Sequence, residues 1–113
     1  MAFISIDGLA AELQGGSPVV LLDVRREQAR ASSGLEIPGA IWRNPAFWLD
    51  WKDEFLTTPR VLLYCAHGHE ISQGLAATLR AMGVDALSLS GGFSAWRAAG
   101  RPLRRVESDT DTP

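Results

Sequence analysis

Strand-length apolar runs alternate with segments of helical spacing, and this alternation limits the possible folds most strongly. Three such runs cover residues 18–24, 61–65 and 84–89. A run with few polar interruptions is typical of a strand that is buried on both faces, as in a parallel sheet. Because helical segments lie between the runs, we expect an α/β domain with a mainly parallel sheet.

The remaining segments fill in this alternation. A short edge strand is expected at residues 3–6, and helices are expected at 7–16, 26–34, 44–56, 71–83 and 91–100. In the helix at 71–83, Ile71, Leu75 and Leu79 recur at helical spacing and predict its inner face. The final stretch, "RRVESDTDTP", has no apolar period, so we expect one domain at 1–103 and a mobile tail at 104–113.

Charge and cysteine content exclude several classes of protein. The 113 residues include 11 Lys and Arg against 13 Asp and Glu, which gives no electrostatic reason to expect nucleic acid or an anionic membrane as a partner. No apolar run approaches the ~20 residues that span a bilayer, and the first residues do not resemble a secretory signal. The single cysteine cannot form an internal disulfide. We therefore expect a cytoplasmic protein.

The stretch "YCAHGHEIS" at residues 64–72 holds the only cysteine, Cys65, and both histidines. Cys65 falls where a predicted strand ends and a predicted helix is about to begin. In open parallel sheets, ligands bind outside the carboxyl ends of the strands. A loop that enters a helix can aim its N–H groups at one point, and the helix N-terminus adds partial positive charge. The stretch therefore favours a thiolate nucleophile in an anion cradle, with Gly68 easing the turn.

Two other interpretations of Cys65 stay open at this point. A free cysteine often packs in a core as a small apolar side chain. Cys65, His67 and His69 are also all metal-ligand types, although no fourth ligand is evident in the sequence.

Four stretches, taken together, resemble the single-domain rhodanese (thiosulfate sulfurtransferase) family. They are "LLDVRREQA" at 21–29, "IPGAI" at 37–41, "VLLYCAHGH" at 61–69 and "GGFSAWRAAGRPL" at 91–103. They occur in the family's order and spacing and cover about residues 3–103. The resemblance implies a rhodanese-like fold, with about five mainly parallel strands flanked by helices on both faces and the cysteine loop at the carboxyl edge.

The resemblance also implies roles for particular residues. Cys65 would be the nucleophile that accepts sulfur, and the cradle would be formed by the backbone of Ala66, His67, Gly68, His69 and Glu70. Asp23 and Arg25 would form a structural ion pair rather than act in catalysis.

The implied activity is transfer of a sulfane sulfur through a persulfide on Cys65. The donor would be thiosulfate or a related small anion, and the acceptor a thiol or a protein. We expect no cofactor and no metal ion.

The sequence departs from the family's pattern at two places. Glu70 stands where many members carry a small hydroxyl or a basic residue, and its carboxylate would repel a dianionic donor. A protonated His67 or His69 would offset this charge. Glu36 replaces a histidine that is frequent in the family.

Two alternative functions remain. One is a rhodanese-like interaction or regulatory module without catalysis. The other is a phosphatase or arsenate reductase on a related fold, but those enzymes carry an arginine at the sixth position after the cysteine, where this chain has Ile71.

Overall fold

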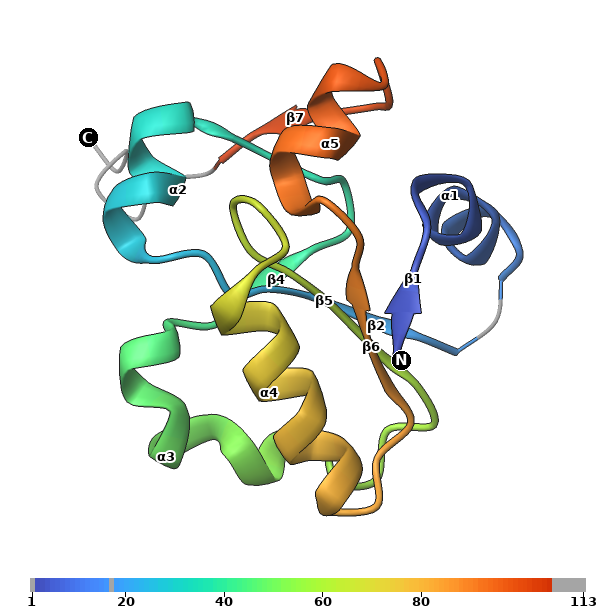
Figure 1. The fold of residues 1–113 in the computed structure, drawn as a ribbon, viewed down its shortest axis with the longest axis vertical. Coiled ribbons are helices and arrows are strands. Elements are labelled where there is room, and N and C mark those ends of the chain that lie inside the picture. The colour runs from blue at the N-terminus through green and yellow to red at the C-terminus, as the bar shows by residue number, and fades with distance from the viewer. Residues whose placement is uncertain (1, 17, 107–113) are drawn as a thin grey trace, which may run out of the picture.

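The computed structural model describes residues 2–16 and 18–106 as one alternating series of strands and helices. The elements are β1 (Phe3–Ile4), α1 (Ile6–Gln14), β2 (Val20–Asp23), α2 (Glu27–Ser33), β3 (Leu35–Glu36), β4 (Ile41–Trp42), η1 (Pro45–Phe47), α3 (Trp48–Trp51), η2 (Lys52–Phe55), β5 (Val61–Tyr64), α4 (Glu70–Ala81), β6 (Ala86–Leu89), α5 (Gly92–Ala98) and β7 (Arg104–Arg105), where η denotes a 3-10 helix (Figure 1). Among the described helices, none is long and apolar enough to cross a membrane.

Five strands form a parallel sheet in the order β1-β6-β5-β2-β4. The apolar runs of the sequence supply its three central strands, and all four residues of β5 are buried. The α/β class and the five-stranded sheet predicted from the sequence are confirmed, and the sheet is parallel throughout.

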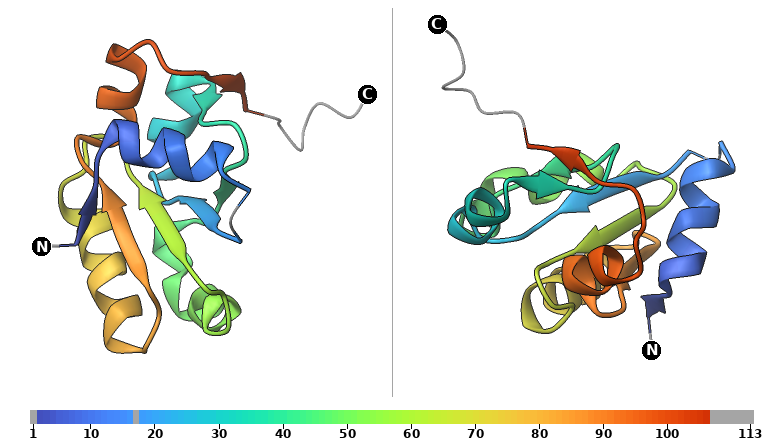
Figure 2. Two further views of the ribbon diagram at one scale, coloured as in Figure 1. Left: turned by 90° about the vertical axis from the view of Figure 1, so that its right-hand side faces the viewer. Right: turned by 90° about the horizontal axis from the view of Figure 1, so that it is seen from above.

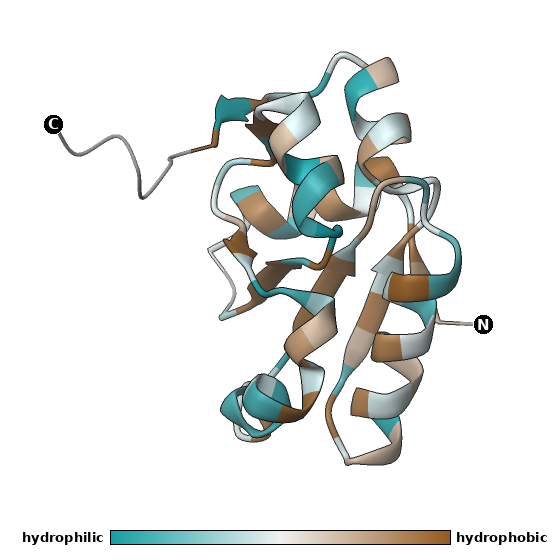
Figure 3. Ribbon diagram, turned by 90° about the vertical axis from the view of Figure 1, so that its left-hand side faces the viewer, coloured by the Kyte–Doolittle hydropathy of each residue, from teal (hydrophilic) through white to brown (hydrophobic). Residues whose placement is uncertain are grey.

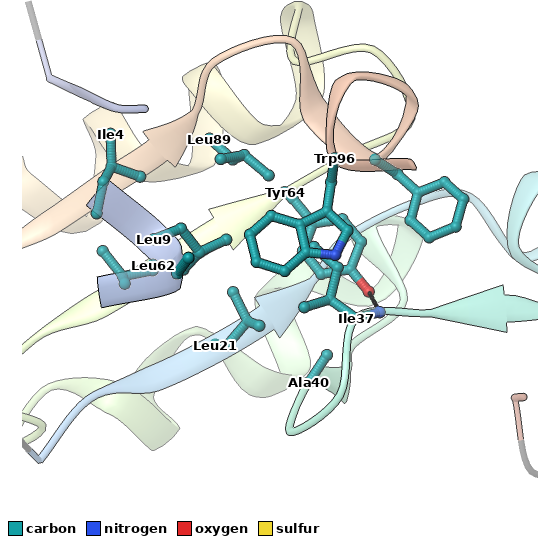
Figure 4. Close-up of a cluster of buried hydrophobic side chains, with 11 residues drawn as sticks. Ile4, Leu9, Leu21, Ile37, Ala40, Leu62, Tyr64, Leu89 and Trp96 are labelled. Atoms are coloured by element: carbon teal, nitrogen blue, oxygen red, sulfur yellow. Dashed lines mark hydrogen bonds between the residues drawn. The ribbon is translucent and has the colours of Figure 1, made fainter. Parts of the chain in front are cut away.

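Helices cover both faces of this sheet (Figure 2). Successive residues of a strand point to opposite faces, so Leu62 joins the core under α1 and α5, whereas Leu63 joins the core under α4. Figure 4 shows the first core, in which Trp96 and Tyr64 pack near Leu9. In Figure 3 the strands between the helices are mostly brown, as expected for strands buried on both sides.

The carboxyl ends of the two central strands place the sequence motifs side by side. In the register of β2 with β5, Asp23 lies opposite Tyr64. Arg25 and Cys65 follow directly, so both leave the sheet at the same edge. This edge is where open parallel sheets bind their ligands.

The segment that was predicted to be one helix at 44–56 is broken into η1, α3 and η2. Asn44 does cap its start, because its side chain accepts from the N–H of Ala46 at 3.0 Å. The carbonyl of Asn44 is taken by the indole N–H of Trp51 at 2.8 Å, and the N–H of Trp48 bonds to Pro45 instead. The carbonyl of Asn44 also accepts from the N–H of Phe47 at 3.0 Å. A 3-10 bond and the indole together therefore take the place of the backbone bond that would have started a regular α-helix.

The first residues of the predicted mobile tail form a strand in the structure. Arg104 and Arg105 form β7, which pairs antiparallel with β3. The buried carboxylate of Glu36 accepts from Arg104 at 2.7 Å and from Arg30 at 3.4 Å, so it fixes this strand to the domain. Residues 107–113 of the predicted tail lie outside the described part of the chain, and the division into domain and tail stays a prediction.

The side chain of Tyr64 ties the sheet edge to the segment after β3. Its hydroxyl donates to Asp23 at 3.0 Å. It also accepts from the N–H of Ile37 at 3.2 Å, the bond drawn in Figure 4. Burial and then the negative charge of Asp23 raise the pKa of Tyr64 far above its ordinary value of 10.0.

Tyr64 is the only tyrosine, so tyrosinate absorbance reports the ionisation of this residue alone. Its raised pKa links that ionisation to the stability of the fold at alkaline pH. In the unfolded chain it ionises near pH 10, so its contribution is intact below that pH. As the pH rises further, we expect the free energy of unfolding to fall by about 1.4 kcal/mol per pH unit. Tyrosinate absorbance should appear only together with loss of circular dichroism. Tyrosinate formation in the folded protein near pH 10 would contradict this prediction.

Candidate active site

Cys65 lines a pocket of about 410 Å³ at the carboxyl edge of the sheet, with only 5% of its surface exposed. The pocket is formed by the loop after β5, the start of α4 and the segment from Arg25 to Ala29. Of the predicted cradle residues, Ala66, His67, His69 and Glu70 line this pocket, whereas Gly68 faces away from it. Cys65 also packs against the apolar core under α4, so its thiol has one buried side and one side toward the pocket.

The carbonyl groups of the loop are bound on the side away from the pocket. The N–H of Phe93 donates to the carbonyl of Cys65 at 2.8 Å, and the N–H of Ser94 donates to that of Ala66 at 2.9 Å. The carbonyl of Gly68 accepts from the side-chain amide of Gln73 at 2.6 Å. Three of the loop's peptide groups are thus fixed by their carbonyl ends.

This arrangement turns the N–H groups of the same peptides toward the opposite side. In a trans peptide the C=O and N–H bonds point in opposite directions. Fixing the carbonyls of Cys65, Ala66 and Gly68 against α5 and Gln73 therefore directs the N–H groups of the following residues away from those partners. None of the N–H groups at positions 66–71 donates to another described residue. With the first turn of α4 they provide donors for an anion.

Two glycines allow the loop to approach α5 so closely. A Cβ on Gly68 would lie 2.7 Å from the N of Gly91 and 2.9 Å from the O of Leu89, and the φ of Gly68 is +72°. A Cβ on Gly92 would lie 2.5 Å from the carbonyl oxygen of Cys65. Real Cβ atoms do not approach backbone atoms this closely, so both positions require glycine.

Each nitrogen of the Arg25 guanidinium donates to another residue in the structure. It donates to both carboxylate oxygens of Asp23, with the shortest contact at 2.7 Å, and to the carbonyl of Leu35 and the hydroxyl of Ser33. It also lies 4.2 Å from the ring centre of Phe93 in α5. Arg25 therefore joins β2, β3 and α5 around the site, while its donors are used internally.

Exposed charges surround the mouth of the pocket. His67 and His69 have ring centres 6.4 Å apart, and Nδ1 of His67 lies 3.0 Å from the hydroxyl of Ser94. Glu70 is exposed in the first turn of α4. Arg26, which the sequence analysis did not single out, lines the same pocket, and its guanidinium makes no hydrogen bond or ion pair with another described residue. Its position directly after Arg25 at a strand end was the signal available in the sequence.

Two buried serines were also missed. Ser72 Oγ lies 3.2 Å from Cys65 Sγ, and Ser88 Oγ lies 2.8 Å from Ser72 Oγ. The predicted inner face of the helix is displaced by one residue in its first half: Ser72 and Ala76 are buried there, whereas Ile71 and Leu75 are only partly buried, and Leu79 is buried as predicted. Apolar spacing cannot reveal a small polar residue that faces inward.

A second hollow of about 650 Å³ adjoins the cysteine pocket, and both share Arg26 and Ile71 as lining residues. Its walls come from η1, α3 and α4, including the half-buried Trp48. Within the described residues, no group of three or more His, Cys, Asp and Glu side chains is placed to hold a metal ion.

Comparisons with known proteins agree with this geometry. A family model described as the rhodanese-like domain matches residues 5–99. A search of curated proteins finds no significant match.

Three solved structures illustrate the similarity. A protein of unknown function from Rhodopseudomonas palustris, described as a possible tyrosine phosphatase, is 28% identical over 92% of this chain and 85% of its own, with a TM-score of 0.81. A rhodanese-like domain protein from Staphylococcus aureus is 29% identical over 95% and 100%, with a TM-score of 0.79. A thiosulfate sulfurtransferase from Pseudomonas aeruginosa is 32% identical over 96% of this chain but only 20% of its own length, with a TM-score of 0.77.

The close approach of the loop to α5 can be tested with a matched pair of glycine substitutions. Gly68 and Gly34 have nearly the same φ, +72° and +67°, but a Cβ on Gly34 would meet nothing within 4 Å. Gly34→Ala should cost about 1–2 kcal/mol for backbone strain alone. Gly68→Ala adds the steric conflict and should cost about 3 kcal/mol or more.

The free energies of unfolding in urea measure this difference. If the two alanine variants lose the same stability, the proposed steric requirement at Gly68 is wrong.

Proposed function

Because this chain belongs to the rhodanese-like domain family, we propose that it is a sulfurtransferase that carries a sulfane sulfur as a persulfide on Cys65. One observation supports this most directly. The thiol of Cys65 lines a pocket into which the loop's unpaired N–H groups and the start of α4 can direct partial positive charge. Such a cradle suits an anionic donor and the persulfide anion made from it.

In the first step, the Cys65 thiolate attacks the outer sulfur of thiosulfate or a related donor. A bond forms between Sγ and that sulfur, and the bond from that sulfur to the rest of the donor breaks. With thiosulfate, sulfite leaves with the bonding electron pair, and the persulfide keeps one negative charge on its outer sulfur. We expect the N–H groups of Ala66, His67 and His69, together with the first turn of α4, to hold this anion.

In the second step, a thiophilic acceptor attacks the outer sulfur of the persulfide. The new bond forms to the acceptor, the Sγ–S bond breaks, and its electron pair returns to Cys65 as a thiolate. A thiolate acceptor thereby becomes a persulfide, and cyanide becomes thiocyanate. The two half-reactions need no change in oxidation state of the protein over one full cycle.

The alternative of a phosphatase is less well supported by the site. The neighbour from Rhodopseudomonas palustris is described as a possible tyrosine phosphatase, so this chemistry needs a physical test here. A phosphate fork requires a guanidinium that can donate two parallel bonds. Ile71 occupies the position where the sequence analysis expects that arginine, and each guanidinium nitrogen of Arg25 already donates to Asp23, Ser33 or Leu35. Arg26 also lines the pocket, but it comes from the segment after β2 and not from the cysteine loop, where those phosphatases carry their arginine.

Sulfur uptake by Cys65 is the decisive test. We expect the protein, incubated with thiosulfate, to gain one sulfur atom by intact mass spectrometry and to lose it on addition of cyanide or a thiol. Cys65→Ser should gain none, because its hydroxyl cannot form a persulfide.

The outcomes separate the candidate functions. No gain from any sulfane donor would favour the non-catalytic interaction module. Hydrolysis of a phosphate ester without sulfur uptake would favour the phosphatase.

Two opposite charges at the pocket should set the affinity for anionic donors. Glu70 repels a dianion and Arg26 attracts it, and both face solvent at the pocket mouth. We expect Glu70→Gln to raise kcat/KM for thiosulfate about threefold to tenfold and Arg26→Gln to lower it by a similar factor.

Both changes should shrink at high ionic strength, because exposed charges are screened. Steady-state kinetics at two salt concentrations measure this. An unchanged or lower kcat/KM in Glu70→Gln would refute its proposed role, and an unchanged value in Arg26→Gln would refute that of the arginine.

A further inference from the structure

A chain of two buried hydroxyl groups leads from the sheet to the thiol of Cys65. Ser72, in the first turns of α4, lies 3.2 Å from Sγ, and Ser88, in β6, lies 2.8 Å from Ser72. Both serines are buried, with exposed fractions of 0% and 1%. Neither serine lines the pocket, so they reach Sγ from the interior of the protein.

The ionisation state of Cys65 determines in which direction these two hydroxyl groups can donate their hydrogen bonds. A thiolate has no proton and can only accept, so Ser72 must donate to Sγ and is then free to accept from Ser88. A neutral thiol can also donate to Ser72, whose hydroxyl oxygen has two lone pairs. Either Ser72 or Ser88 must then direct its own proton to another acceptor at a buried position, which is costly.

We propose that Ser88 and Ser72 form a hydroxyl relay that stabilises the thiolate of Cys65. Ser72 touches the reacting sulfur, and Ser88 acts through Ser72 as a positioning residue. The inference rests on the proposed function for its role in catalysis, but the relay itself concerns only the ionisation of the thiol.

The relay should matter most when Cys65 is the leaving group. In the loaded state the negative charge lies on the outer sulfur, within the N–H cradle, and Sγ carries little charge. When the acceptor attacks, the bonding pair returns to Sγ, and the donated proton of Ser72 stabilises the thiolate that forms. In the loading step the same hydrogen bond increases the fraction of thiolate but makes each thiolate less nucleophilic. These two effects on the loading rate partly cancel.

Other ionisable groups also face this thiol and must be kept constant. On the pocket side they are His67, His69 and Glu70 from the loop and α4, and Arg25 and Arg26 from the segment before α2. On the core side, the apolar cluster around Cys65 consists of uncharged residues. The serine variants leave all these groups in place, so a shift in the pH dependence reports the relay.

The primary experiment measures the rate at which iodoacetamide alkylates Cys65, as a function of pH. At neutral pH we expect Ser72→Ala to react about tenfold more slowly than the wild type, with the midpoint of its pH profile moved to higher pH. On the alkaline plateau it should react as fast or faster, because a less stabilised thiolate is more nucleophilic. Ser90→Ala is the matched control, since Ser90 is an exposed serine two residues beyond Ser88.

A double-mutant cycle separates the relay from a general loss of packing. Ser88→Ala should shift the midpoint in the same direction but less, by about twofold to threefold in rate at neutral pH. The double variant with Ser72→Ala should react like Ser72→Ala alone, because Ser88 acts only through Ser72. Ser72→Thr, which keeps the hydroxyl, should restore most of the wild-type profile.

The two half-reactions then connect the relay to sulfur transfer. In single-turnover measurements above the midpoint, Ser72→Ala should load sulfur from thiosulfate at least as fast as the wild type. It should pass that sulfur to cyanide about tenfold more slowly.

The possible outcomes distinguish the relay from the proposed function. A Ser72→Ala protein with the wild-type pH profile overturns the relay, whatever its sulfur transfer. If that variant does not fold, an unchanged profile in Ser88→Ala overturns it equally. A shifted alkylation profile in a protein that takes up no sulfur supports the relay and refutes the sulfurtransferase.

Discussion

The site depends on the way α5 holds the outer side of the cysteine loop. Two N–H groups at the start of α5 bind the carbonyls of Cys65 and Ala66, and the glycine pair lets the two backbones come close enough to do so. Because a peptide group is planar, fixing its oxygen also fixes the direction of the neighbouring N–H. The donors that face an anion in the pocket are therefore positioned by a helix that does not line it. This gives a physical reason for glycine at position 92, the second of the two glycines that precede the last helix in the sequence.

The buried charges of Asp23 and Arg25 are not expected to act on a substrate, because they are paired with each other and with neighbouring residues. Arg25 and Asp23 lie at the sheet edge beside Cys65, but their mutual bonds and those to Tyr64, Ser33 and Leu35 use their polar atoms. A buried pair of this kind joins segments and leaves little net field at the pocket. The charges free to act on a substrate are at the mouth, where solvent weakens each of them. Binding of the proposed anionic donor would then rely chiefly on backbone dipoles.

Much of the architecture could be predicted because strands and helices are encoded in short, contiguous stretches of the sequence. A run such as "VLLY" reports burial on both faces, and a parallel sheet follows when such runs alternate with helices. The position of Cys65 at a carboxyl edge follows from the same pattern. The break at 44–56 could not be predicted in this way, because it depends on an indole of Trp51 reaching back to the carbonyl of Asn44. Likewise, β7 requires Glu36 to meet Arg104 across 68 positions of chain.

The serines show most clearly where a pattern of apolar residues stops being informative. Ser72 is tolerated inside the core because its hydroxyl meets Cys65 and also Ser88, which lies 16 residues away and in another element. A helix drawn from apolar spacing places Ile71 inward, whereas the structure turns Ser72 toward Sγ. Cys65 therefore has donors on two sides, backbone N–H groups toward the pocket and a hydroxyl toward the core. A charge can move between the outer sulfur of a persulfide and Sγ while a donor remains next to it in either position, and this is the requirement of a sulfur carrier that must both load and release.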